Sequence, residues 1–146
     1  MDTEGLLKSL NAHDVQDVLI GATAFPAHGY ARATLDVDAF VSATRANVER
    51  VHAALVAFGY DLTAVSVDEM LTKKILIRQH ILETDIHPFV AGATFEEVWD
   101  RRVTTQVGDT PTQVASLDDL IKMKEAAGRP KDIEDLRVLR RLRDRT

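Results

Sequence analysis

Residues 18–41 read VLIGATAFPAHGYARATLDVDAFV, and the outline of the fold can be worked out from them. The apolar run that ends at Ile20 is stopped by Gly21, which is typical of a short strand buried on both faces. Residues 23–28 form a tight apolar stretch that predicts one or two helical turns. From residue 35 to 41 apolar and acidic residues alternate, which predicts a second strand.

Two carboxylates stand one residue apart on this second strand. Side chains of residues i and i+2 project from the same face of a strand, so Asp36 and Asp38 converge. Like charges that close repel each other, and Mg²⁺ relieves the repulsion by binding a few carboxylate oxygens together with water and phosphate. Asp85, in a later alternating run, can supply a third ligand. The alternative is that Asp-x-Asp in a surface strand is only a solvated face.

Helical and extended patterns also alternate in the rest of the chain. Leucines at helical spacing predict a helix over 4–12, and an apolar stripe between Thr44 as N-cap and Gly59 predicts another. β-Branched residues predict two antiparallel strands, one ending at Ile77 and one over 81–87. Further predicted elements are a helix near 95–101, a strand near 103–107, a helix opened by a capping box at 116–119, and a last helix capped by Asp132 with Ile133, Leu136, Leu139 and Leu142 toward the core.

Length and composition favour one soluble domain. The chain has 146 residues, of which 45% are hydrophobic, so a core of ordinary size can form. The predicted fold class is α/β (α+β), with a small mixed central sheet and flanking helices in a single domain over 1–146. The absence of cysteine excludes disulfides, a thiolate nucleophile and sulfur-ligated zinc, and it fits a reducing compartment, so we expect a cytoplasmic protein.

Charge and hydropathy restrict the partners. A net charge of −5 argues against a surface that is basic all over, as a general nucleic-acid binder would have. No stretch reaches the ~18 apolar residues of a membrane helix, so no membrane partner is expected. The one cluster of basic residues, near the C-terminal end, either binds RNA phosphates or forms a solvated helix face. It consists of Arg137, Arg140, Arg141, Arg143 and Arg145.

The strand that ends in Gly21, the short helix and residues 28–38 (HGYARATLDVD) resemble the active-site motif of the DNA polymerase β-like nucleotidyltransferase superfamily. In that family a Gly-Gly or Gly-Ser turn precedes a strand with Asp-x-Asp, and a later strand carries a third carboxylate. Residues 116–124 (SLDDLIKMK), with 128–132 (GRPKD), look like a minimal bacterial branch related to abortive-infection toxin nucleotidyltransferases. The resemblance implies a nucleotidyltransferase-like fold.

The same resemblance implies the site and the activity. Asp36, Asp38 and Asp85 would be catalytic and would hold Mg²⁺ or Mn²⁺. The activity would be Mg²⁺-dependent transfer of a nucleoside monophosphate from a nucleoside triphosphate to a hydroxyl acceptor (RNA, protein or small molecule), in a toxin–antitoxin or phage-defence setting. The implied nucleotide-binding residues are Gly21, Ala22, Thr23, Arg32 and Lys124.

The turn departs from the family pattern, because it reads Gly21-Ala22-Thr23. Alanine keeps the backbone donors but disfavours positive φ and lacks a hydroxyl. Either Thr23 supplies the hydroxyl one position later, or the turn is degenerate. A degenerate turn favours the alternative function, a non-catalytic binding module that acts through a protein partner.

The supporting residues each have two interpretations. Arg32 either contacts phosphate or pairs with Asp61 or Asp68 on the surface. His28 either has a functional role, in which it orients phosphate or acts as a base, or is a capping or packing residue. Lys124 either points toward the active site or is a cation that favours a helix C-terminus.

Two acids and two aromatic residues complete the candidates. Asp132 and Asp135 look like the acid pair of the family's last motif, but acids are favoured in the first turn of any helix, so we expect a structural role. Tyr30 and Trp99 are candidates for base stacking, and either can instead belong to the core.

Overall fold

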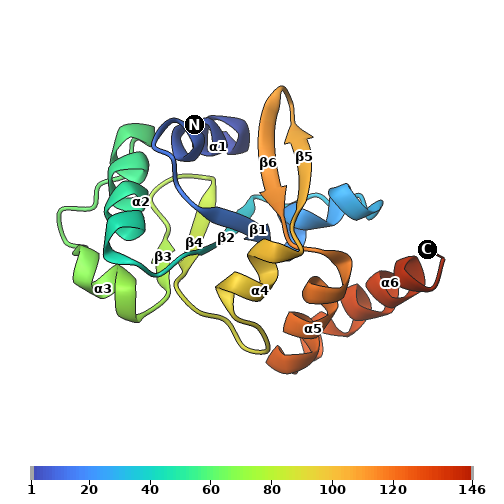
Figure 1. Ribbon diagram of the computed structural model, residues 1–146. Coiled ribbons are helices and arrows are strands. Elements are labelled where there is room, and N and C mark those ends of the chain that lie inside the picture. Colours follow the sequence, from blue (N-terminus) through green and yellow to red (C-terminus); the bar gives the residue numbers. More distant parts are fainter. Residues whose placement is uncertain (1, 146) are drawn as a thin grey trace.

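The computed structural model describes residues 2–145 and contains a six-stranded sheet flanked by helices (Figure 1). This arrangement confirms the predicted mixed α/β class. The elements are α1 (Thr3–Ala12), β1 (Asp17–Ile20), the 3₁₀ helix η1 (Gly21–His28), β2 (Asp36–Val41), α2 (Arg45–Phe58), α3 (Val67–Thr72), β3 (Ile75–Ile77), β4 (Glu83–His87), α4 (Phe95–Asp100), β5 (Val103–Val107), β6 (Thr110–Val114), α5 (Leu117–Ala127), the 3₁₀ helix η2 (Pro130–Asp132) and α6 (Ile133–Asp144).

The strand order is β3-β4-β2-β1-β6-β5. β2 lies antiparallel to β1 and parallel to β4, so these three strands form the middle of the sheet. In the β2–β4 ladder Asp36 is opposite Glu83, and Asp38 is opposite Asp85. Directly opposed residues on neighbouring strands project from the same face, so the register gathers these carboxylates on one face.

The two faces of β2 differ in chemistry. Val37, Ala39 and Val41, which share one face of the strand by the period of two, are fully buried. Asp36, Asp38 and Phe40 share the opposite face by the period of two. There Phe40 packs edge-on against Phe95 of α4, with 5.4 Å between the ring centroids. The apolar end of this face is therefore closed by α4, and the acidic end is left for the site.

The ends of α2 follow the sequence prediction. The Thr44 side chain accepts a hydrogen bond from the backbone N–H of Asn47, and Gly59 ends the helix with φ 124°. The buried Asn47 amide donates to the carbonyls of Gln16 and Ser42. One side chain thus fastens the start of α2 to the segments that flank β1 and β2.

Most predicted elements are confirmed, and three elements were not predicted, namely α3, β6 and the short 3₁₀ helix η2. The strands β3 and β4 are antiparallel, as expected from the β-branched pattern. The unpredicted helix α3 begins after the N-cap Ser66 and is too short for a helical period to stand out. The unpredicted strand β6 contains Pro111, a residue that disfavours strands because it lacks a backbone donor.

Two details at the C-terminal end were wrong. Asp132 does not cap α6 with its side chain, and Ile133 is 67% exposed rather than in the core. At the start of α5 only half of the predicted capping box forms, because Ser116 accepts from the backbone of Asp119. The Asp119 carboxylate instead accepts a hydrogen bond from Arg101 at 2.8 Å.

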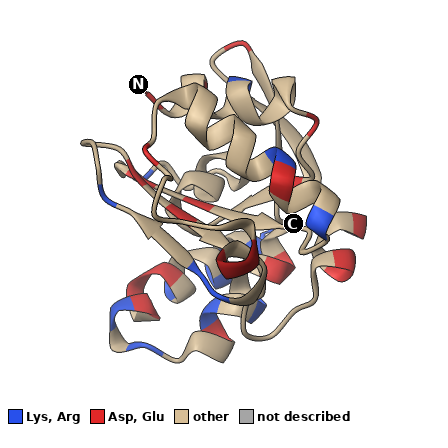
Figure 2. Ribbon diagram, turned by 90° about the vertical axis from the view of Figure 1, so that its left-hand side faces the viewer, with Lys and Arg blue, Asp and Glu red and all other residues tan. Residues whose placement is uncertain are grey.

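Charges of both signs are interspersed over the helices in Figure 2, in keeping with the net charge of −5. Three of the five C-terminal arginines pair with acids, Arg137 with Glu134, Arg140 with Glu125 and Arg143 with Asp144. These pairs favour the solvated-helix interpretation over an RNA-binding face. Within residues 2–145, no helix combines the length and the apolar character needed to cross a membrane.

Candidate active site

Three acidic side chains meet in one open cavity of about 360 Å³ beside the Gly21 turn. Asp36 and Asp38 reach the cavity from β2, and Asp85 reaches it from β4. One further wall, the β3 wall, comes from Lys74 and Arg78, which flank β3, and the other wall, the α5–α6 wall, comes from α5, η2 and α6. The structure thus brings together the three carboxylates that the sequence singled out.

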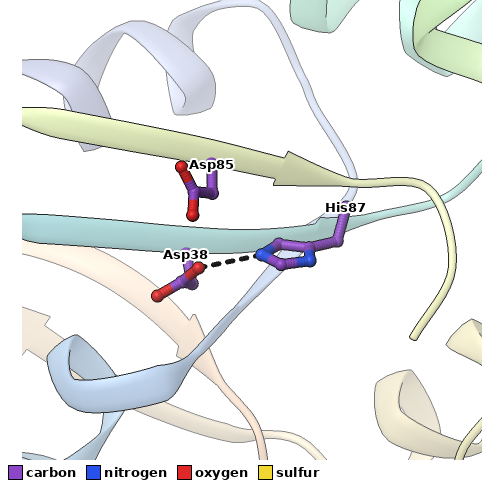
Figure 3. A group of neighbouring side chains, drawn as sticks. All are labelled: Asp38, Asp85 and His87. Carbon is purple, nitrogen blue, oxygen red and sulfur yellow. Dashed lines mark hydrogen bonds and ion pairs between the residues drawn. The ribbon is translucent and has the colours of Figure 1, made fainter. Parts of the chain in front are cut away.

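The tightest group in the cavity consists of Asp38, Asp85 and His87, whose ligand atoms all lie within 4.8 Å of one another (Figure 3). The His87 Nε2 and Asp38 Oδ1 atoms are 2.8 Å apart. His87 was placed on the same strand face as Asp85 by the alternation, but it was not predicted as part of the site. Its position two residues after Asp85 was the signal that could have found it.

Asp36 lies in the same cavity but outside that group of ligand atoms. It is exposed at the start of β2, where it faces Glu83 across the ladder. A hydrogen bond with Asp36 is the largest cause that raises the pKa of Glu83 above its usual value. The two carboxyl groups therefore act as a pair at the starts of β2 and β4.

The donors fit a divalent cation. Carboxylate oxygens are the usual ligands of Mg²⁺ and Mn²⁺, whereas imidazole is a more usual ligand of zinc, copper and iron. A group that hydrogen-bonds a ligating carboxylate fixes its orientation. The arrangement therefore fits Mg²⁺ or Mn²⁺ between Asp38 and Asp85, with His87 orienting Asp38.

Glycine is required at position 21. The residue has φ +69°, and a Cβ there would lie 2.6 Å from Asp38 Oδ2. Both facts exclude a larger residue without a local shift. The backbone of the turn can approach the carboxylates this closely only because Gly21 has no side chain.

The other two turn residues lie in different surroundings. Ala22 lines the cavity and is not strained, because Asp14 is the only non-glycine residue between 2 and 145 with positive φ. Thr23 is not among the residues that line this cavity. It lines a second cavity of about 450 Å³, between η1 and β5, and its buried hydroxyl has no hydrogen-bond partner. The turn therefore presents backbone groups but no hydroxyl toward the carboxylates.

The opposite wall carries cations fixed by two buried acids. Lys124, with a side chain only 14% exposed, lies 3.0 Å from Asp132 and 3.5 Å from Asp135. Arg129 Nε donates to Asp132 at 2.8 Å. Burial opposes ionisation of Asp132, but the bonds from Arg129 and Lys124 outweigh it and hold its pKa below the usual value. Asp132 and Asp135 thus do more than stabilise a helix start, because they position cations at the cavity.

Arg32 belongs to the same wall. Its Nη1 donates to Asp135 Oδ2 at 2.6 Å, and the residue lines the cavity. The surface alternative is wrong, because Asp68 pairs with Arg45 and the Asp61 side chain accepts hydrogen bonds from Thr63. Long-range pairing over about one hundred residues of sequence could not be read from the local pattern.

Other predicted candidates do not line the cavity, although the Tyr30 hydroxyl donates a hydrogen bond to Asp135 Oδ1 at 3.2 Å. His28 Nε2 lies 2.8 Å from the Ala115 carbonyl oxygen, which supports its packing interpretation. Tyr30 stacks on Phe25, and Trp99 lies under the Arg102 guanidinium at 3.8 Å. None of these residues lines the carboxylate cavity.

Comparison with known proteins agrees with this geometry. No curated protein matches the chain. The model of one protein family, described as nucleotidyl transferase of unknown function (DUF2204), matches residues 2–146. Because this match spans nearly the whole sequence, the chain belongs to that family of nucleotidyl transferases.

Proposed function

We propose that the chain is a Mg²⁺- or Mn²⁺-dependent nucleotidyltransferase that moves a nucleoside monophosphate from a nucleoside triphosphate to a hydroxyl acceptor. The observation that carries the proposal is the meeting of Asp38 and Asp85, with Asp36 beside them, at a turn whose backbone reaches the Asp38 carboxylate. The family description supports the same chemistry.

The triphosphate would lie between the Gly21 turn and the wall that holds Lys124, Arg129 and Arg32. Backbone N–H groups in a tight turn bind phosphate oxygens, and cations neutralise them. Because Lys124 and Arg32 are already held by Asp132 and Asp135, little reorganisation is needed when the phosphates bind.

The carboxylates would serve the transfer itself. A divalent cation held by Asp38 and Asp85 supplies, when bound, charge neutralisation at the attacking and leaving oxygens. Asp36 and Asp38 face the triphosphate, and His87 keeps Asp38 oriented. Asp85 faces the acceptor and takes the proton of the attacking hydroxyl.

The proposal includes the finer assignments that follow from the sequence resemblance. These are membership of the DNA polymerase β-like superfamily, the branch related to abortive-infection toxins, and a cytoplasmic toxin–antitoxin or phage-defence setting with a protein partner. The chain of motifs from Gly21 to Asp135 supports them.

The test is incorporation of label from each of the four α-labelled nucleoside triphosphates into components of a cell extract. The wild-type protein should label an acceptor in the presence of Mg²⁺ or Mn²⁺. Asp38→Asn and Asp85→Asn should lose about 100-fold or more of the rate, because transition-state charge is left uncompensated. Asp68→Asn is the matched control, since Asp68 pairs with Arg45 outside the cavity.

A second candidate is a binding module of this fold without turnover. It is favoured by the turn, where Ala22 has no hydroxyl and the Thr23 hydroxyl does not line the carboxylate cavity. A module would show a nucleotide- and metal-dependent rise in melting temperature but no incorporation of label. Absence of both responses at millimolar metal would contradict both candidates.

A further inference from the structure

On the β3 wall, Arg78 binds Asp85, one of the three candidate catalytic acids. Arg78 Nη1 donates to Asp85 Oδ1 at 2.7 Å, and Arg78 Nε lies 3.5 Å from Glu83. The Arg78 side chain is 43% exposed, so it can move without breaking the core. As long as this bond persists, Asp85 Oδ1 is occupied and the charge of the carboxylate is partly neutralised, so Asp85 binds a cation and accepts a proton less readily.

A second cation lies on the same wall. Lys74 also lines the cavity, and among residues 2–145 no acidic partner lies within ion-pair distance of it. The neighbouring Lys73 is different, because its Nζ lies 3.3 Å from Glu69 and the residue does not line the cavity. Lys74 therefore adds an uncompensated positive charge to the cavity that Asp85 also lines.

The position of this wall assigns it to the acceptor side. β3 and β1 lie on opposite sides of the β2–β4 pair that carries Asp38 and Asp85. In an in-line displacement the attacking and leaving oxygens lie on opposite sides of the phosphorus. If the leaving phosphates lie at the Gly21 turn after β1, the attacking hydroxyl enters from the side of β3.

We propose that the acceptor carries a phosphate group close to its reacting hydroxyl, and that this phosphate binds Lys74 and draws Arg78 away from Asp85. This inference rests on the proposed function for the existence of an acceptor, the position of the triphosphate and the role of Asp85. Arginine prefers a bidentate phosphate to a single carboxylate contact, and Lys74 adds a second point of attachment. Arrival of the acceptor thereby uncovers the acid that the reaction needs.

The group transfer itself is unchanged. The acceptor oxygen forms a bond to the α-phosphorus, the bond from that phosphorus to the bridging oxygen breaks, and pyrophosphate leaves with the electron pair. The hydroxyl proton passes to Asp85. Without a phosphate-bearing acceptor, Arg78 stays on Asp85, and transfer to water is suppressed.

The phosphate can come from an RNA 3′ end, where a phosphodiester adjoins the terminal ribose, or from a free nucleoside monophosphate. The probe is a short fluorescent single-stranded RNA with a free 3′ hydroxyl, titrated with protein in EDTA without nucleoside triphosphate. Competition with AMP, and with adenosine as the phosphate-free control, separates the sources. Displacement by AMP indicates a single phosphate, and binding that AMP does not displace indicates the polymer.

The matched pair of variants is Lys74→Ala and Lys73→Ala, which remove the same charge from adjacent positions. Lys74→Ala should weaken RNA binding about fivefold and reduce its salt dependence by about one phosphate contact, whereas Lys73→Ala should change neither. Equal effects of the two substitutions would overturn the proposal. So would a Lys74→Ala variant that binds ATP more weakly and RNA as well as wild type.

Arg78→Gln gives a readout that a structural role would not produce. It should weaken RNA binding and at the same time tighten Mn²⁺ binding, because Asp85 is freed. If Arg78→Gln weakens both RNA binding and Mn²⁺ binding, or weakens neither, the proposal that Arg78 covers Asp85 is overturned.

If RNA binds with these effects and no nucleoside triphosphate binds, the proposed function fails, but the phosphate-binding site at Lys74 and Arg78 stands. If label is transferred to RNA equally by Lys74→Ala and wild type, the acceptor inference alone fails.

Discussion

The two walls of the cavity use the same residue types in opposite ways. On the α5–α6 wall, Lys124 and Arg129 are bound by Asp132, whose side chain is only 2% exposed. On the β3 wall, Arg78 reaches a partially exposed Asp85 from solvent, and Lys74 has no acidic partner among the residues that the structure describes. Ion pairs whose acid is buried are costly to break, whereas exposed pairs contribute little to stability.

The difference separates a fixed surface from an exchangeable one. If a cation on the α5–α6 wall moved away, a buried carboxylate would lose its ion-pair partner. These cations are therefore suited to holding a ligand in one geometry. Cations on the β3 wall can change partners at low cost. We therefore expect substitutions on the first wall to change stability, and substitutions on the second to change binding alone.

The largest expected effect tests the fixed wall. Asp132→Ala should lower the free energy of unfolding by about 4 kcal/mol, because it leaves Arg129 without its buried partner and leaves Lys124 with Asp135 alone. Lys74→Ala on the other wall should change it by less than about 0.5 kcal/mol. Urea denaturation measures both. Equal losses for the two variants would break the comparison.

Asp132 and Asp17 are both buried acids, but their pKa values are shifted in opposite directions. Burial raises the pKa of Asp17 to about 7, whereas cations hold the pKa of Asp132 below its usual value. Between about pH 4 and pH 7 folded Asp17 keeps a proton that the unfolded chain releases, so its contribution to stability falls as pH rises. The contribution of Asp132 is present above its unfolded pKa and is lost as pH falls.

Asp17→Asn should therefore match the wild type near pH 4 and exceed its free energy of unfolding by on the order of 3–4 kcal/mol above pH 7. Urea denaturation across this pH range measures the difference. A constant difference over the whole range would show that Asp17 does not titrate in this window.

The sequence could predict the local features of the site but not the distant partners of its side chains. The period-two pattern around Val37 placed Asp36 and Asp38 on one face, since strand periodicity is local, whereas the expectation that Asp85 joins them came from the family resemblance. The partners of those side chains were not predictable. The Arg32–Asp135 pair joins residues 103 positions apart, and the Arg78–Asp85 bond depends on how β3 turns into β4.

The secondary structure shows the same limit. Thr44 and Gly59 mark the ends of α2 because capping is a local property. Asp132 has the sequence features of a cap, but its side chain binds Lys124 and Arg129 instead. A residue that can satisfy either a local or a distant partner is assigned only once the packing is known.

A smaller effect is expected at the turn between the walls. Gly21→Ala should cost about 2–3 kcal/mol, because it combines a strained φ with a Cβ only 2.6 Å from Asp38 Oδ2. Gly29→Ala is the matched control, with φ +95° but no atom closer than 3.8 Å to the added Cβ. Thermal unfolding of both variants isolates the contact with Asp38. Equal costs would mean that the turn does not rest on that carboxylate.

The smallest effect concerns Thr23. Thr23→Val removes a buried hydroxyl that has no hydrogen-bond partner, so it should stabilise the protein by about 1 kcal/mol. Nucleotide affinity should stay unchanged, because Thr23 does not line the carboxylate cavity. Calorimetric titration with a nucleoside triphosphate measures the affinity. A severalfold loss would place the hydroxyl on the phosphates after all.

The central claim is that Asp38 and Asp85 form a metal site that works with a nucleotide. The most direct measurement is Mn²⁺ binding, followed by electron paramagnetic resonance, with and without a non-hydrolysable nucleoside triphosphate. We predict that the nucleotide tightens Mn²⁺ binding to the wild type and that Asp38→Asn abolishes this gain, because the two ligands share one site. Wild-type protein that binds no Mn²⁺ at millimolar concentration with the nucleotide present would contradict the account.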